Sequence, residues 1–130
     1  MPIDHIRLTQ QARDQLITLK RRTGIQHWNV LCRWALCRSL AEPAKPPAIK
    51  LTFDSNVEMN WRTFSGEVGD VLWALVTLRA HNDGLPVDEE TLAQQFRLHL
   101  HRGIGYLVGD PRVIDVAGLA SVGLSEPPAA

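Results

Sequence analysis

The sequence predicts a mainly α-helical fold: one small domain of about five helices, with a short strand or an extended arm at its N-terminus. Apolar residues recur at helical spacing along most of residues 9–107, and breaks containing glycine or proline separate these stretches. The chain has 130 residues, 45% of them hydrophobic, which suits a single core. We expect residues 1–109 to form the helical domain. Residues 110–130 show no firm period and are expected to form a poorly ordered tail.

The N-terminal part predicts a strand followed by two helices. Residues 3–8 carry the apolar and β-branched side chains of a short strand. Thr9 is a good N-cap for a helix that Gly24 ends. Residues 26–42 are apolar almost all the way round a second helix, which indicates a central core helix or one that also faces another subunit; we favour the subunit interface. A strand before two helices is also the layout of ribbon-helix-helix DNA-binding proteins, whose strands pair between two chains.

The rest of the chain predicts three more helices. A proline-rich stretch at 43–47 forms a stiff connector, and residues 49–53 form a short strand or a loop. Ser55 and Glu58 match a capping box. The expected helices are a short one that follows this box and ends at Gly66, one over residues 67–80, and one that begins near Asp88 and continues in kinked form past Gly103 and Gly105.

The composition also limits compartment and cofactors. No run of 18 apolar residues is present, so no membrane span is expected, and the N-terminus lacks the form of a signal peptide. We therefore expect a cytoplasmic protein. Cys32 and Cys37 are the two cysteines, and they fall short of the four thiolates that an iron–sulfur cluster usually needs. No cofactor is expected.

Charge is divided unevenly along the chain. Residues 1–50 hold nine Lys and Arg against three Asp and Glu, whereas residues 51–130 hold five against eleven. A basic half can neutralise phosphates and release their counterions, which is the sequence-independent part of nucleic-acid affinity. The alternative is two solvated faces that keep a small protein soluble. The candidate DNA-binding residues are Arg7, Arg13, Lys20, Arg21, Arg22, Arg33, Arg38, Lys45 and Lys50.

The sequence shows no catalytic constellation. His99 and His101 invite a metal or nuclease interpretation, but residues two apart on a helix point in different directions, so we assign neither a metal site nor a catalytic residue. Tyr106 is the only tyrosine, and a histidine could activate it only in a geometry that the sequence does not show. The four tryptophans fall on apolar helical positions, which indicates core packing; stacking on exposed bases is the alternative.

Three long stretches resemble the DndE family of DNA sulfur-modification (phosphorothioation) proteins. They are Arg22–Ala35, Ser55–Glu67 and His99–Ile104, and the likeness covers roughly residues 4–109 in the same order. The resemblance implies a bacterial system that replaces a non-bridging phosphate oxygen of DNA with sulfur. It also implies partners that supply the sulfur, namely a cysteine desulfurase, an iron–sulfur protein and an ATPase.

Within that system the resemblance implies a small homo-oligomer that binds double-stranded DNA, with nicked duplex as the suggested ligand. We expect a DNA-binding accessory subunit whose basic surface is multiplied in a dimer or tetramer. A nick makes the duplex easier to bend, so a rigid charged surface could prefer it without reading bases. Two alternatives stay open: a nickase of the same system, and a scaffold that binds only the protein partners.

Overall fold

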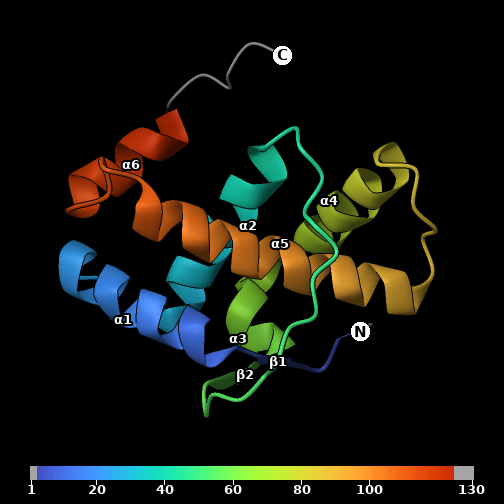
Figure 1. Cartoon of the computed structure of the whole chain (residues 1–130), viewed down its shortest axis with the longest axis horizontal. Coiled ribbons are helices and arrows are strands. Elements are labelled where there is room, and N and C mark those ends of the chain that lie inside the picture. The colour runs from blue at the N-terminus through green and yellow to red at the C-terminus, as the bar shows by residue number, and fades with distance from the viewer. Residues whose placement is uncertain (1–2, 125–130) are drawn as a thin grey trace.

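The computed structural model describes residues 3–124, and it confirms the mainly α-helical prediction (Figure 1). A short two-stranded sheet lies at the N-terminal end of the helices. The elements in chain order are β1 (His5–Arg7), α1 (Gln10–Thr23), α2 (Trp28–Ala41), β2 (Glu58–Asn60), α3 (Trp61–Ser65), the 3-10 helix η1 (Gly66–Val68), α4 (Gly69–Asn82), α5 (Glu89–Gly109) and α6 (Val116–Leu124).

The boundaries of α1 follow the predicted caps. The hydroxyl of Thr9 accepts a hydrogen bond from the backbone N–H of Ala12, and Gly24 ends the helix with a left-handed φ of 75°. The capping box predicted at Ser55 is wrong. The hydroxyl of Ser55 instead donates to the carbonyl of Leu8, and the side chain of Asn60 caps α3 by accepting from the N–H of Thr63.

The N-terminal strand pairs within its own chain. Strand β1 runs antiparallel to β2, with Ile6 opposite Met59, and both side chains are buried. The strand of the ribbon-helix-helix layout is therefore present, but in this chain its partner is β2 rather than the same strand of another subunit. The pairing fixes the start of α1 beside the connector that leads into β2.

Helices α2 and α5 form the centre of the fold. The longest helix, α5, crosses the molecule in Figure 1, and its contact with α2 is the most extensive between any two elements of the described chain. Beside this contact lies an aromatic cluster of Trp61, Phe64, Trp73 and Phe96, whose ring centroids are 5.3–6.4 Å apart. All four tryptophans pack against or within the core, as predicted.

The two central helices approach most closely at Gly103 of α5. A Cβ atom at this position would lie 1.7 Å from the backbone oxygen of Ala35, so no other residue fits without moving a helix. Gly105, two residues later, has open space where its Cβ would be. The first glycine therefore serves packing, whereas the packing of this chain gives no reason for the second.

Helix α2 packs as a core helix of this chain, and the subunit interface that we favoured from its pattern stays a prediction. Its buried side chains face α5, α1 and α3 within the same chain. Among the described helices, α4 carries the most large exposed apolar side chains, with Val71, Leu75 and Leu78 42–59% exposed.

The segment after α5 also differs from the sequence prediction. Residues 116–124 form helix α6, which buries Leu119 and packs against α1. A tail without regular structure was expected from residue 110, and its last residues, 125–130, lie outside the described part of the chain. Within the described residues, no helix is both long and apolar enough to cross a membrane.

The two glycines of α5 should respond oppositely to the same substitution. Gly103→Ala should lower the free energy of unfolding by about 3 kcal/mol or more, because the new methyl group overlaps the α2 backbone. Gly105→Ala should raise it by about 0.5–1 kcal/mol, because alanine favours a helix and meets open space. Urea denaturation of both variants measures this. An equal change in the free energy of unfolding for both variants would show that Gly103 is not a close contact between α5 and α2.

Candidate nucleic-acid interface

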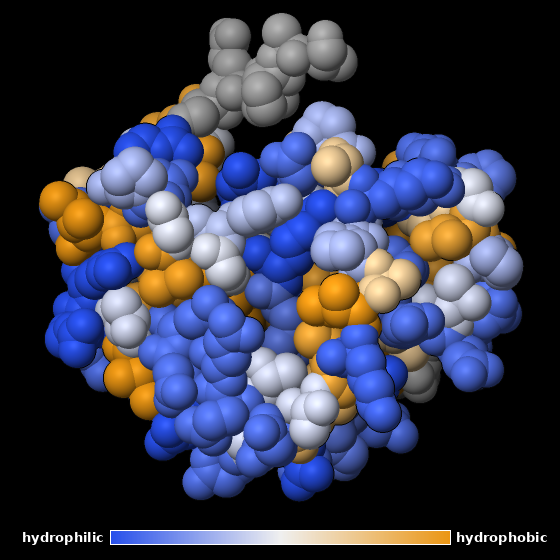
Figure 2. Space-filling view, in the orientation of Figure 1, coloured by the Kyte–Doolittle hydropathy of each residue, from blue (hydrophilic) through white to orange (hydrophobic). Residues whose placement is uncertain are grey.

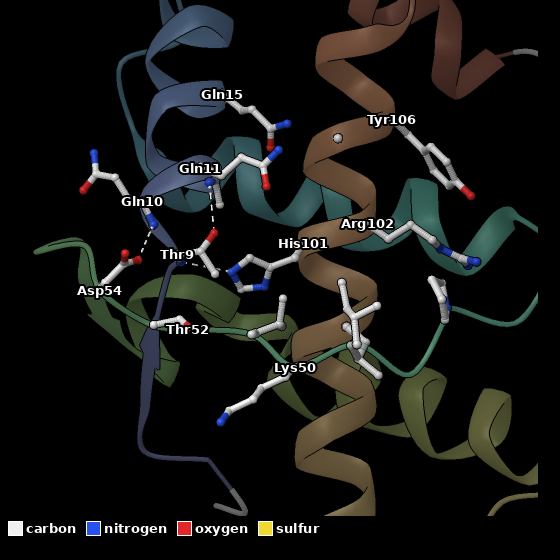
Figure 3. A pocket seen from close by; sticks show the side chains of 16 residues that line it. Thr9, Gln10, Gln11, Gln15, Lys50, Thr52, Asp54, His101, Arg102 and Tyr106 are labelled. Atoms are coloured by element: carbon white, nitrogen blue, oxygen red, sulfur yellow. Dashed lines mark hydrogen bonds between the residues drawn. The ribbon is translucent and has the colours of Figure 1, made fainter.

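The segment between α2 and β2, residues 42–57, is called the connector below. A cleft of about 640 Å³ opens between the start of α1, the middle of α5 and residues 47–54 of the connector (Figure 3). Its α1 wall carries three glutamines, and apolar residues such as Ala12, Leu51 and Leu98 also line it. Lys50 and Thr52 contribute from the connector, and His101, Arg102 and Tyr106 from α5. The glutamines that line it are Gln10, Gln11 and Gln15, and Figure 3 shows the last two pointing from α1 towards α5.

Two arginines position the connector wall of this cleft. Arg79 of α4 donates to the carbonyls of Leu40, Pro43 and Ala44 at 2.8–3.2 Å. Arg102 of α5 donates to the carbonyls of Ser39 and Ala44 at 2.8 and 2.7 Å. The last carbonyls of a helix lack partners within the helix and form the negative end of its dipole, so cationic donors suit them. The connector is thereby held at its start, before it passes in front of α5 in Figure 1.

A buried hydroxyl and a buried imidazole complete this anchor. The Ser39 hydroxyl accepts from Nε of Arg102 at 2.8 Å and lies 2.8 Å from Nδ1 of His99. Since the guanidinium can only donate, the hydroxyl proton is directed to Nδ1, which must then be unprotonated. Burial, and after it the charges of Arg102 and Arg79, lower the pKa of His99 to about 4. His99 is therefore neutral at pH 7 and serves the packing of α5 on α2.

The second histidine faces a different partner. Nε2 of His101 accepts from the backbone N–H of Thr9 at 3.3 Å, so its Nδ1 carries the proton and donates to the carbonyl of Arg97 at 2.8 Å. Burial lowers the pKa of His101. Its ring lies 5.8 Å from that of Phe53 and forms part of the cleft wall. The two histidines thus point to separate neighbours, as their spacing on a helix predicts.

The nine candidate cations fall into two groups. Four are exposed: Arg7, Arg21, Lys45 and Lys50. Among residues 3–124, Arg21, Lys45 and Lys50 make no hydrogen bond or ion pair, and Arg7 makes an exposed contact of 3.8 Å with Glu58. The half-buried group is Arg13, Lys20, Arg22, Arg33 and Arg38. Figure 2 shows that hydrophilic residues cover most of the face crossed by α5 and the connector.

Three of the half-buried arginines have structural partners. Arg22 donates to the carbonyl of Val108 at 2.9 Å, and Arg33 to that of Phe64 at 2.7 Å. Arg38 lies 3.8 Å from Glu42 and over the ring of Tyr106. The chain therefore does not present its nine cations as one continuous surface.

The basic triplet at the end of α1 is divided between three environments. Successive helical residues turn by about 100°, so neighbours in sequence diverge around the axis. Lys20 lies 4.3 Å from the centroid of the Trp28 ring, Arg22 is tied to α5, and Arg21 is exposed. Arg21 is thus the member of the triplet with the greatest freedom to meet a ligand.

Sequence reasoning missed most of the cleft. Gln11, Gln15, Arg102 and Tyr106 line it, yet the glutamines are uncharged and Arg102 belongs to the acidic half. Folding joins that arginine to the connector, more than fifty residues earlier. Gln11 and Gln15 are four residues apart and therefore lie on one face of α1. This spacing is the feature of the sequence that could have indicated a polar wall.

The chain matches a known protein family over most of its length. The profile of the family described as "DNA sulphur modification protein DndE" matches residues 5–115. Among solved structures, the chain is similar to DndE from Escherichia coli B7A, involved in DNA phosphorothioation modification, with 24% identity and a TM-score of 0.69 over 82% of this chain and 98% of that chain.

A second solved structure gives the same fold. A glycine-to-lysine mutant of DndE, involved in DNA phosphorothioation, is 23% identical with a TM-score of 0.63 over 80% of this chain and 95% of that chain. Among curated proteins, no significant match was found.

Acid should weaken the fold through His99. Its folded-state pKa of about 4 lies below the ordinary value of 6.5, so between these pH values the unfolded chain binds more protons than the folded one. The free energy of unfolding should therefore fall as the pH drops from 6.5 to 4, by up to about 3 kcal/mol. Denaturation curves across this range measure the slope.

His99→Asn should flatten that slope, because an amide oxygen can accept from Ser39 and does not titrate. The matched control is His81→Asn, on the exposed end of α4, which should keep the slope of the unchanged protein. If His99→Asn and His81→Asn lose stability equally with acid, His99 does not cause the dependence.

Proposed function

Because the chain belongs to the DndE family of DNA sulphur modification proteins, we propose that it is a DNA-binding accessory subunit of a bacterial phosphorothioation system. Its family gives it a role in DNA sulphur modification. The observation that supports DNA binding is the set of exposed cations, above all Arg21, Lys45 and Lys50, which have no hydrogen bond or ion pair within residues 3–124. Cations without internal partners can neutralise phosphates without breaking the fold.

The proposed ligand is duplex DNA with a preference for a nick. Cations on α1 and the connector meet a backbone, not base edges, so their binding carries no sequence information. A nicked duplex bends at lower cost than an intact one and can follow a rigid protein surface more closely. The half-buried Lys20 and Arg13 add to the exposed cations: Lys20 lies over the Trp28 ring and Arg13 lies 3.6 Å from Asp14, but neither is tied to a backbone carbonyl.

We propose that the subunit binds DNA and does not cut it. Tyr106 lies near two cations, with the guanidinium carbons of Arg38 and Arg102 at 4.8 and 5.4 Å from its ring centroid. Both ring nitrogens of His101 already have partners, and His99 is buried. Neither histidine is therefore arranged as a base for the tyrosine hydroxyl. The desulfurase, the iron–sulfur protein and the ATPase implied by the family would supply the sulfur chemistry.

The proposed subunit assembles with copies of itself through α4. Val71, Leu75 and Leu78 are spaced by four and three residues and form one exposed apolar stripe. In an antiparallel pairing of two α4 helices around Leu75, the acidic start of one helix, at Asp70, lies towards the end of the other, at His81. This two-fold arrangement covers each apolar stripe with its copy, and it doubles the number of exposed cations.

Removal of the exposed cations should weaken DNA binding for all sequences alike. The combined variant Arg21→Ala, Lys45→Ala and Lys50→Ala should bind a duplex less tightly at low salt. The slope of log affinity against log salt should shrink by about 0.9 for each phosphate that the variant no longer neutralises. Fluorescence anisotropy at several salt concentrations measures both quantities.

The matched control for this experiment is Arg62→Ala, since Arg62 is also exposed but belongs to the acidic half of the chain. It should leave affinity and salt slope nearly unchanged. Wild-type affinity in the triple variant would remove these residues from the proposed interface.

A charge on the α4 stripe should separate the subunits. Leu75→Glu places a carboxylate at the centre of the proposed contact, where it would face its own copy and lose solvation. Sedimentation equilibrium should give a smaller oligomer than that of the unchanged chain, with the same helical content by circular dichroism. Ala74→Glu, which adds the same charge at the neighbouring exposed position, is the comparison; an unchanged mass for Leu75→Glu would exclude α4 as the interface.

A further inference from the structure

Two hollows meet on the surface of α5. The first is the cleft between α1, α5 and the connector, and the second is a more open hollow of about 500 Å³ at the C-terminal end of α5. Gly105 and Tyr106 line both. The second hollow is completed by Arg38, Gly109, Asp110, Pro111 and Arg112. A single groove therefore runs from the start of α1 across α5 to the segment that precedes α6.

The crossing point of this groove is Gly105. Glycine in the middle of a helix costs stability relative to alanine. At this position a Cβ atom would have no atom of another part of the fold within 4 Å. At Gly103 the contact with α2 explains why a glycine is needed despite its cost in stability. At Gly105 no other part of the described chain fills the space that a side chain would take. The missing side chain keeps the two hollows continuous, which is what a ligand that lies across α5 requires.

The groove carries a small excess of positive charge. Lys50, Arg102, Arg38 and Arg112 line it, against the two carboxylates of Asp54 and Asp110. Asp54 accepts from the backbone N–H of Gln10. Asp110 is bonded to Arg112, which lowers the pKa of that carboxyl. Glu42 lies 3.8 Å from Arg38 at the edge of the same region.

The uncharged lining suits nucleobases. The amide side chains of Gln11 and Gln15 point towards α5 and offer both donors and acceptors, as base edges do. Tyr106 and Arg102 lie on the other side of α5 from Gln11 and Gln15 in Figure 3. Aromatic rings and guanidinium planes stack on unpaired bases. A cleft of about 640 Å³ has the size of a small-ligand site, in which one or two nucleotides fit but a duplex does not.

From these observations we propose that the groove across Gly105 binds a short unpaired stretch of a DNA strand, with bases in the α1–α5 cleft and phosphates near Lys50 and Arg38. This inference rests on the proposed DNA-binding function and deepens it. The exposed cations would hold the duplex, and the groove would take nucleotides that leave the helix at an interruption. A gap with free nucleotides should therefore be a better ligand than a simple nick.

The test uses four DNAs: an intact duplex, a nicked duplex, a duplex with a single-stranded gap of three nucleotides, and a free single strand that contains the sequence of the gap. Fluorescence anisotropy with the full chain should give about tenfold tighter binding to the gapped than to the intact duplex, from the stacking of one or two bases. Gly105→Leu places a side chain at the crossing point, where its Cβ meets no atom of another part of the fold within 4 Å, so it should abolish this preference and leave the affinity for intact duplex unchanged.

The matched control is Gln94→Leu, an exposed position on the same helix that lines neither hollow; it should keep the gap preference. Circular dichroism and thermal unfolding should show that Gly105→Leu is at least as stable as the unchanged chain. Equal affinity for gapped and intact duplex, or a gap preference that survives Gly105→Leu, would overturn the groove. Binding to a free single strand without binding to any duplex would support the groove and overturn the proposed duplex-binding function. Binding to none of these DNAs would overturn both.

Discussion

The close approach of α5 to α2 at Gly103 is the contact on which the candidate site depends. Because the helix backbones touch at Ala35, the side chains on either side of the contact fall into two fixed sets. His99 and Arg102 reach Ser39 on α2, while His101 turns towards the start of α1. One small residue therefore decides which neighbours of α5 become structural and which line the cleft.

The cleft depends on backbone carbonyls as much as on side chains. The end of α2 offers carbonyls without helical partners, and Arg79 and Arg102 satisfy them from two different helices. These bonds fix the first residues of the connector, and the rest of it then passes in front of α5 as one wall of the cleft. Because Arg102 also lines the cleft, the same guanidinium joins the stability of the fold to the shape of the site.

The local sequence predicted where helices begin and end better than it predicted what they pack against. Thr9 and Gly24 bound α1 as expected because cap geometry involves only a few neighbouring residues. Ser55 failed as a cap because its hydroxyl is used by a carbonyl 47 residues away. Helix α6 was missed because it is short and buries Leu119 alone among its described residues. An apolar pattern also could not tell whether α2 meets other helices of its chain or another subunit, since both surfaces exclude water equally well.

The fate of the cations shows why a charge count along the chain is an incomplete guide to a binding surface. Arg22 and Arg33 come from the basic half, yet each reaches a carbonyl of another element, because a long side chain with five donors can satisfy a distant backbone group. Lys45 and Lys50, on the connector, stay exposed. Arg102, from the acidic half, joins them at the cleft. The basic surface is therefore assembled by tertiary structure from both halves of the chain, and its centre lies on the connector and α5 as much as at the end of α1.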